Sequence, residues 1–338
     1  TVVPFLMISA DARASRLGEQ GVATSTDAFS QHWNPSKSVF LDNISGVGVS
    51  YTPYLSKLVS DVFLANINYY KIIDQRSAWS TSFKYFSLGD IDILQNPQDI
   101  PYLENPNEFT LDASYILKLS DYFSMGVTGR FLMSDVKLQS VNSDSSSANS
   151  FAVDISGFYQ SNERAYDNFN GLWRFGFNVS NLGPKMKYEE LGKENFIPTN
   201  LKLGSAFDFI FDSSNKLSLN IELNKLLVPS PSIPIFNSNN QIIGYEQADV
   251  NFLSGVFKSF GDAPDGFSEE LKEFTLALGL EYTYNDSFAL RAGYFGENEN
   301  KGARKYMTFG TGFKLEDINL DLSYPLSTSS VISPLENT

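Results

Sequence analysis

The sequence predicts an all-β protein, a transmembrane antiparallel β-barrel of about 14 strands, and three observations support this fold class. Apolar residues alternate with small or polar ones from about residue 46 to about residue 325. The aromatic content is 14%, as in barrels that carry aromatic girdles at both membrane interfaces. Mean hydropathy is −0.18 and no run of about 18 apolar residues occurs, which excludes a helical membrane span.

The alternation is clearest between residues 275 and 284, where Leu276, Leu278 and Leu280 are separated by small, polar or charged residues. Successive side chains of a strand point to opposite faces, so such a segment has one apolar face and one polar face. Strands of soluble sandwiches are usually about 5–6 residues long. Many segments here run to roughly ten or more, the length that crosses a bilayer at a tilt. The pattern therefore favours a barrel over a sandwich.

Fourteen strands are predicted along the chain, and several are joined by tight turns such as 120–121 and 285–286. They span residues 46–55, 59–72, 76–90, 107–119, 122–138, 148–161, 169–182, 198–211, 214–228, 248–260, 271–285, 287–297, 304–315 and 317–325. An even number places both ends of the barrel on one side of the membrane. We expect a single domain, with an N-terminal plug-like segment at 1–45 and the transmembrane barrel at 46–338.

The lengths of the connections test this topology. With the N-terminus in the periplasm, the long connections 91–106, 139–147, 183–197 and 229–247 all face outward. Most connections at the opposite end are short, and 261–270 is the main exception. Long outer loops and short periplasmic turns are typical of bacterial outer-membrane barrels.

Residues 1–45 do not follow the strand pattern, because small residues and glycines interrupt them. One interpretation is a disordered leader. The segment is not of low complexity, however, and it contains the apolar anchors Phe5, Leu6, Met7, Leu17 and Trp33. We therefore expect a plug tucked into the periplasmic mouth of the barrel. The chain begins at Thr1 without a methionine, and we expect it to be the mature form of an exported protein.

Composition argues against catalysis and against nucleic acid as a partner. The net charge is −14, whereas nucleic-acid binding needs a basic surface. The chain has no cysteine, which excludes thiol catalysis and cysteine-based metal sites. It has one histidine, His32, from which neither a catalytic triad nor a histidine-rich metal site can be assembled without strong partners. We predict a hydrogen-bonded His32 in the plug, no catalytic residue, no cofactor and no metal.

Charged residues elsewhere have structural interpretations. The turn at 261–266 has two aspartates, but it lacks the ligand spacing of an EF-hand, so a solvated acidic turn is favoured over a calcium site. Charges at inward positions of the strands should pair inside the lumen, because buried charges must be paired or hydrated. These are Asp112, Lys118, Arg130, Arg174, Glu222, Glu281 and Arg291.

One loop, 226–245, departs from the polar norm. Pro229, Pro231 and Pro234 should stiffen it into an extended form and prevent it from adding to a sheet. Its apolar members are Leu226, Leu227, Val228, Ile233, Ile235, Phe236, Ile242 and Ile243. Such a surface needs a cover. Two interpretations stay open at this point: the loop folds inward over the mouth of its own barrel, or it inserts into a partner protein as a stiff apolar finger.

Part of the N-terminal segment resembles a sequence signature of a known superfamily. The run "DARASRLGEQGVATSTDAFSQHWNPS" resembles the N-terminal signature of the FadL-like barrels, in which a small-residue, glycine-containing stretch leads to an Asn-Pro step. The matching residues here are Arg13, Gly18, Gly21, Asn34 and Pro35. Within that superfamily the chain is most similar to the PorV/PorQ branch, and to the PorV family in particular. The likeness covers the whole chain in architecture but only about residues 10–36 in motif.

The resemblance implies a fourteen-strand FadL-like barrel that belongs to the type IX protein secretion system. Such a protein would dock on the large translocon barrel, receive secreted cargo through its C-terminal signal domain, and pass it to the surface-attachment machinery. It would sit among lipid in the outer membrane of a Gram-negative bacterium, with its long loops extracellular. We expect the apolar loop to bind the partner, through Val228, Pro229, Pro231, Ile233, Pro234, Ile235, Phe236, Ile242 and Ile243.

Two other functions are kept as alternatives. The first is a FadL-like channel for long-chain fatty acids or other hydrophobic small molecules, and the second is a purely structural barrel. The channel requires an apolar pocket in the lumen. Inward-facing Asp112, Arg130, Glu222 and Glu281 make the expected lumen too polar for a long acyl chain.

Overall fold

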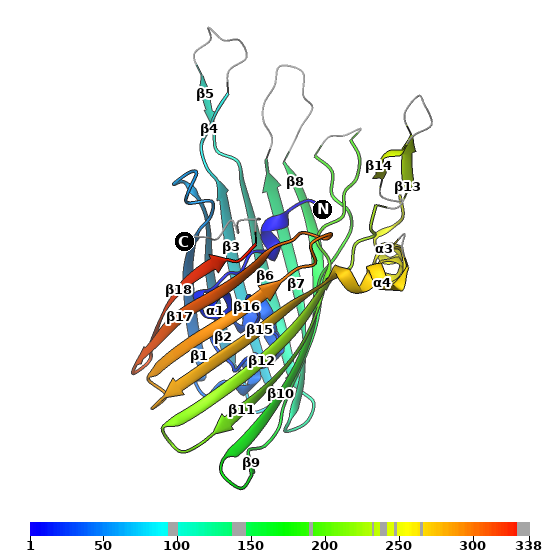
Figure 1. The fold of residues 1–338 in the computed structure, drawn as a ribbon. Coiled ribbons are helices and arrows are strands. Elements are labelled where there is room, and N and C mark those ends of the chain that lie inside the picture. The colour runs from blue at the N-terminus through cyan, green and yellow to red at the C-terminus, as the bar shows by residue number, and fades with distance from the viewer. Residues whose placement is uncertain are drawn as a thin grey trace.

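The computed structural model describes residues 1–93, 101–136, 147–188, 192–231, 233–236, 242–246, 249–263 and 266–329. An antiparallel sheet of fourteen strands curves around the N-terminal segment to form a tilted barrel (Figure 1). The predicted fold class is therefore confirmed. No helix in the described residues is long and apolar enough to cross a membrane.

The strands pair in an unbroken path of neighbours. In order they are β1 (Ser45–Pro53), β2 (Val62–Ile72), β3 (Ser77–Leu88), β6 (Asn107–Lys118), β7 (Phe123–Asp135), β8 (Ala148–Gln160), β10 (Asn170–Leu182), β11 (Asn200–Ile210), β12 (Asn215–Leu226), β15 (Phe274–Tyr284), β16 (Phe288–Gly296), β17 (Lys305–Leu315) and β18 (Ile318–Ser327). The fourteenth, β9 (Arg164–Ala165), pairs with β10 beside the path. Two small hairpins, β4 (Ile91–Ile93) with β5 (Tyr102–Glu104) and β13 (Ile233–Phe236) with β14 (Ile242–Glu246), lie outside the barrel sheet.

The strand predicted at 248–260 is wrong, because this segment forms the helix α3 (Phe252–Lys258). Its apolar residues Phe252, Val256 and Phe260 recur every four positions, which is the period of a helix and not of a strand. Asn251 caps the helix, since its side chain accepts a hydrogen bond from the Ser254 N–H at 2.8 Å. The short helix α4 (Phe267–Glu270) and the 3-10 turn η3 (Leu271–Glu273) follow it.

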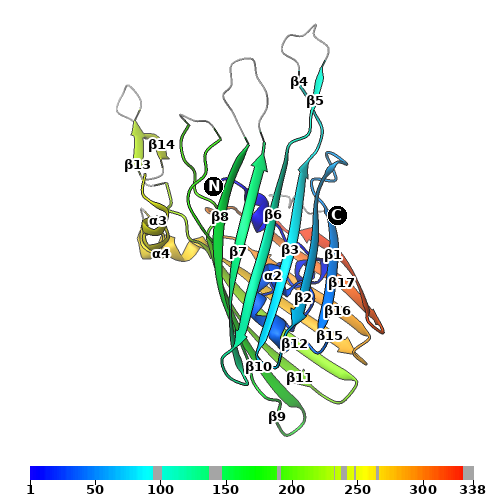
Figure 2. The same ribbon diagram turned by 180° about the vertical axis from the view of Figure 1, so that it is seen from behind.

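Without a strand at 248–260, the path around the barrel has thirteen strands, and the last four run opposite to the expected direction. The prediction that both ends of the barrel lie on one side is therefore wrong, because an odd number of strands in the path puts the start of β1 and the end of β18 at opposite ends. A single connection, 227–273, now joins β12 to β15, so the apolar loop and the segment 261–270 lie at one end. We call this the long-loop end; it also carries the connections 89–106, 136–147 and 183–199. The short-turn end carries 73–76, 119–122, 161–169, 211–214, 285–287 and 316–317, among which 161–169, with β9, is the one longer connection (Figure 2). The sorting of loops by length thus becomes cleaner than the sequence predicted.

The wall is apolar outside and polar inside. On β7 and β8, the outward-facing Val127 and Phe151 are 55% and 66% exposed, whereas the inward-facing Thr128 and Asp154 are buried. Paired positions of neighbouring strands share a face, as Val127 and Ile155 do. A soluble sandwich has the opposite distribution, so this arrangement is that of a barrel surrounded by lipid.

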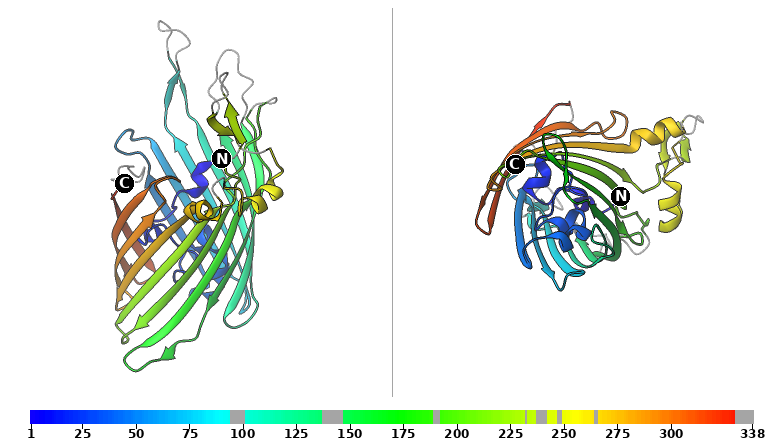
Figure 3. Two further views of the ribbon diagram at one scale, coloured as in Figure 1. Left: turned by 45° about the vertical axis from the view of Figure 1, so that its right-hand side comes forward. Right: turned by 90° about the horizontal axis from the view of Figure 1, so that it is seen from below.

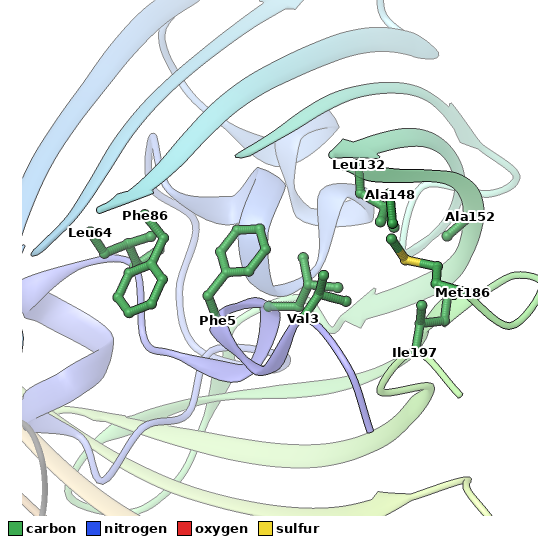
Figure 4. Packing of buried hydrophobic residues seen from close by; sticks show 11 residues of the cluster. Val3, Phe5, Leu64, Phe86, Leu132, Ala148, Ala152, Met186 and Ile197 are labelled. Atoms are coloured by element: carbon green, nitrogen blue, oxygen red, sulfur yellow. The ribbon is translucent and has the colours of Figure 1, made fainter. Parts of the chain in front are cut away.

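The N-terminal segment extends through the lumen instead of lying only at its mouth, and it leaves a cavity of about 370 Å³ beside Trp33, Asn200 and Lys202. It contains η1 (Pro4–Met7), α1 (Ala12–Arg16), α2 (Ser30–Trp33) and η2 (Pro35–Phe40). Near the long-loop end, Val3 and Phe5 pack against inward-facing side chains of several strands, including Leu64, Phe86 and Leu132 (Figure 4). Near the short-turn end, η2 packs Val39 against Ala78 and Ile116. The lumen therefore holds apolar clusters at these two levels, besides a third and smaller one formed by Val22, Ala23 and Ala206.

Candidate docking site

The motif glycines of the N-terminal segment lie where the chain passes closest to other groups. Gly18 has φ of +81°, a conformation that favours glycine, and a Cβ there would lie less than 3.0 Å from the Tyr294 carbonyl of the wall. A Cβ at Gly21 would lie as close to the Trp33 ring. The spacing of the motif thus reflects close packing of the segment.

The strands also have glycines where they face the N-terminal segment, and these residues were not predicted as functional from the sequence. Inward-facing Gly176, Gly204, Gly279, Gly293 and Gly310 approach the segment at 16–23 so closely that a Cβ at any of them would lie less than 3.0 Å from it. We call these five residues the glycine belt. Their signal was present as glycines at inward positions of β10, β11 and β15–β17. It could not be interpreted without knowing that the lumen is filled.

Polar groups fix the same stretch of the segment. The Glu222 carboxylate on β12 accepts hydrogen bonds from the N–H groups of Gly21 and Val22 at 2.9 and 2.8 Å. Asn34 donates to the Val22 and Gly157 carbonyls at 2.8 and 3.0 Å. Asn34 also caps η2, in which Pro35 occupies the first turn. The Asn-Pro step therefore anchors the segment to the wall.

Arg13, the charged member of the motif, forms two ion pairs inside the barrel. Its guanidinium lies 2.8 Å from Glu281 on β15 and 2.7 Å from Asp27 in the segment. Glu281 also pairs with Arg291 on β16. A planar guanidinium suits such a double role, because it can address two carboxylates at once.

Asp11 carries a buried carboxylate at the start of α1. It accepts hydrogen bonds from the Ala14 N–H at 2.8 Å and the Trp33 indole N–H at 2.6 Å. Burial, together with the charge of Asp27, raises its pKa from 3.8 to about 6. The folded chain therefore holds this proton at pH values where the unfolded chain has released it.

The shift predicts a pH dependence of stability. The native contribution of Asp11 is complete below about pH 3.8 and is lost as the pH rises through about 6, so Asp11→Asn should gain about 2 kcal/mol relative to wild type between pH 4.5 and 7. Burial lowers the pKa of His32, so the contribution of His32 to stability changes with pH in the opposite direction. It is common to wild type and variant. The measurement is therefore the wild-type and variant difference in urea-unfolding midpoint at both pH values. A difference that does not change with pH would contradict it.

The lumen charges pair as predicted, with one difference. Arg130 binds Asp112 at 2.7 Å and Asp154 at 3.0 Å, and Arg174 binds Asp208 at 2.5 Å. Lys118 instead lies over the Phe40 ring, 4.5 Å from its centroid. The predicted hydrogen bond of His32 is present, since its Nδ1 lies 3.3 Å from the Lys84 amine.

The apolar loop forms a hairpin at the long-loop end. β13 and β14 pair antiparallel, with Pro234 opposite Tyr245, so the prediction that the prolines would keep this loop out of a sheet is wrong. A two-stranded hairpin has two free edges, and proline is tolerated where no N–H is needed. Ile235 and Ile243 are 41% and 66% exposed. The side chains of Ile233, Pro234, Phe236 and Ile242 lie outside the described part of the chain.

The base of this hairpin is fixed to the barrel. Val228 and Pro229 are buried, whereas Pro231 is exposed. Ser230 donates its N–H to Asp262 at 3.0 Å and its hydroxyl to Glu273 at 2.5 Å. The hairpin itself projects beyond the rim and lies outside the ring of strands when viewed along the barrel (Figure 3). Its position therefore leaves the mouth of the barrel uncovered by these two strands.

The acidic turn is neutralised internally. Carboxylate oxygens of Asp262, Glu270 and Glu273 lie within 4.8 Å of one another. The Lys225 amine binds Glu270 at 3.0 Å and Glu273 at 2.6 Å, so a cation from the chain already occupies this cluster. Residues 264 and 265 of the turn lie outside the described ranges.

Comparisons with known proteins identify a family for the sequence and solved structures with a similar fold. The family model described as "Type IX secretion system protein PorV" matches residues 1–233. Among curated protein sequences, none matches the chain. Solved structures that resemble it include the deltaS2 mutant of the monoaromatic hydrocarbon channel TodX, at 11% identity and TM-score 0.52, covering 95% of this chain and 93% of that one.

Two further structures are similar over nearly the whole chain. The toluene transporter TbuX of Ralstonia pickettii has 11% identity and TM-score 0.50, covering 96% of this chain and 94% of that one. A Pseudomonas aeruginosa FadL homologue has 11% identity and TM-score 0.49, covering 96% and 90%. At such identity the structural likeness concerns the fold. The family match covers well over half of the chain, and the chain therefore belongs to the PorV family of type IX secretion system proteins.

Proposed function

We propose that this barrel docks on the large translocon barrel of the type IX secretion system through the hairpin β13–β14. In this role it receives cargo that carries a C-terminal secretion signal and presents it to the surface-attachment machinery. The long-loop end then faces the outside of a Gram-negative cell. The observation that carries the proposal is the apolar hairpin, which projects beyond the rim from a fixed base.

The physical basis is preorganisation. Ile235 and Ile243 are exposed to solvent, and burying such side chains in a partner contributes about 1.5–3 kcal/mol each. Ser230, held by Asp262 and Glu273, reduces the freedom that the hairpin would lose on binding. An apolar strand pair of this kind fits a groove or an open edge of another β-protein.

The test is the double variant Ile235→Asp/Ile243→Asp in the native bacterium. We expect the barrel to accumulate and fold normally, while co-purification of the translocon in mild detergent falls at least about tenfold, because two desolvated charges oppose docking. Secretion of cargo should fall in parallel. A matched control is Tyr166→Asp, which changes a 46% exposed aromatic residue at the short-turn end.

The same purification separates the alternatives. A large barrel and secreted cargo in the eluate support the docking role, and a lone barrel with fatty acid in its organic extract favours a channel for hydrophobic molecules. Unimpaired docking of the double variant would remove the hairpin from the proposal. The lumen argues against the channel, because the N-terminal segment and the pairs of Arg130 and Arg174 occupy it.

A further inference from the structure

The two short helices at the rim carry the most exposed aromatic side chains of the described chain. Phe257 on α3 is 77% exposed and Phe267 on α4 is 76% exposed. Leu253 and Leu271 are 53% and 55% exposed. We call these four residues the rim patch. Leaving such side chains in water is unfavourable by about 1.5–3 kcal/mol each, so the patch needs an apolar environment.

The patch has a regular geometry. Leu253 and Phe257 are four residues apart on α3, and Phe267 and Leu271 are four residues apart at α4, so each pair lies on one helical face. The opposite faces attach to the barrel. On α3, Gly255 lies opposite the Leu253–Phe257 pair and is buried close to Phe196 and Pro229. On α4, Glu269 lies opposite the Phe267–Leu271 pair and binds Lys301 of the connection between β16 and β17 at 2.6 Å. The wall therefore holds both helices with their apolar faces turned away from it.

The helices lie beside the barrel and not over its mouth. Viewed along the barrel axis, α3 and α4 (yellow) lie outside the ring of strands (Figure 3, right). α4 leads through η3 directly into β15, without a linker. Whatever surrounds the upper edge of this wall therefore also surrounds the helices.

The rim patch continues onto the membrane-facing wall. Leu271 lines a surface concavity of about 520 Å³ together with Leu276 and Tyr294. Charged residues, among them Lys272, Glu299 and Lys305, line the same concavity, so apolar and charged groups meet at this height of the wall. Tyr294 also lines a neighbouring concavity of about 610 Å³, whose walls include the outward-facing Leu278 and Leu280. The apolar surface is thus continuous from α4 down the lipid-facing side of β15 and β16.

We propose that α3 and α4 rest in the interfacial layer of the membrane that the barrel spans, with the rim patch among the lipid chains. Lys258 directly follows Phe257 and Lys272 directly follows Leu271, so each apolar pair is flanked by a lysine that can reach lipid phosphates. Aromatic side chains gather at this depth in membrane barrels. Because Ser230 binds Asp262 and Glu273 of the same connection, lipid contact would also fix the height of the hairpin β13–β14.

The absence of cysteine from the sequence allows a direct test. The variants Phe257→Cys and Phe267→Cys are spin-labelled, and the folded barrel is reconstituted in phosphatidylcholine–phosphatidylglycerol vesicles at low protein density. Collision of each label with oxygen, which enters lipid, and with a water-soluble nickel chelate is measured by electron paramagnetic resonance. Leu219→Cys on the outer face of β12 is the lipid reference, and Ser213→Cys in a short turn is the water reference.

We expect nickel collision at Phe257→Cys and Phe267→Cys to fall at least about threefold below that at Ser213→Cys, with oxygen collision raised. Ser268→Cys, an exposed position beside Phe267, is the matched control and should remain accessible to nickel. Nickel collision equal to that at Ser213→Cys would overturn the proposal. Equal protection at Ser268→Cys would overturn it too, since the helix would then be covered on every side. No partner protein is present, so the outcome is independent of docking on the translocon.

Discussion

Alanine at both Gly176 and Gly293 is expected to release the N-terminal segment from the wall while the barrel stays folded. A Cβ at Gly176 would lie less than 3.0 Å from the Val22 carbonyl, and one at Gly293 would lie as close to the Gly18 nitrogen. Both obstacles are backbone atoms, which cannot rotate aside as a flexible side chain can. Overpacking of this kind costs about 1–3 kcal/mol per site.

The measurement uses Ala10→Cys, a reporter at a fully buried position of the segment. Its reaction with a hydrophilic maleimide should accelerate at least about tenfold in the Gly176→Ala/Gly293→Ala background, because each 1.4 kcal/mol changes an opening equilibrium tenfold. Gly129→Ala is the matched control, since a Cβ at this strand glycine meets nothing within 4 Å. An unchanged labelling rate would show that the glycine belt does not determine the fit of the segment.

Arg130→Met is expected to destabilise the barrel by about 3–5 kcal/mol, the largest single effect among the lumen charges. Arg130 joins Asp112 at 2.7 Å and Asp154 at 3.0 Å, and the side chains of these three residues are at most 4% exposed. When the guanidinium is removed, the carboxylates of Asp112 and Asp154 stay buried but lose their shared cationic partner. The urea-unfolding midpoint of the reconstituted barrel measures the loss.

Two comparisons make this prediction specific. Lys305→Met breaks an exposed pair with Glu299 at 2.8 Å and should change stability by less than about 1 kcal/mol. The triple variant Arg130→Met/Asp112→Asn/Asp154→Asn should recover much of the loss, because it removes the unpaired charges together with their partner. Equal effects of Arg130→Met and Lys305→Met would refute the role assigned to this buried network.

The strands could be predicted from the sequence because a membrane barrel imposes a period of two on every segment. The predicted strands 107–119 and 148–161 differ from β6 and β8 by a single residue at one end. The failure at 248–260 arose where the period changed to that of a helix. Phe252, Val256 and Phe260 are spaced four apart, which fits a helix and not a strand, so the sequence contained the signal that the strand prediction did not use.

Only part of the candidate docking site could be predicted from the sequence. The apolar character of 226–245 was evident, but its hairpin pairing was not, because a proline within a strand usually argues against a sheet. The burial of Pro229 depends on residues distant in the sequence, since Pro229 and Phe196 both lie against Gly255 of α3. The glycine belt was hidden for a related reason: each of its members is an ordinary small residue until the filling of the lumen is known.

The position of α1 between the two ends of the strand path bears on how the barrel assembles. The Ala10 carbonyl accepts a hydrogen bond from Ser50 on β1, and Arg16 pairs with Asp321 on β18, a contact between residues 305 positions apart. Contacts of such high sequence separation form late, because the chain must first close a very long loop. The N-terminal segment, which precedes every strand of the barrel in the chain, is thus among the last to gain its full set of contacts. Folding of the barrel and immobilisation of its contents should therefore end in one concerted step.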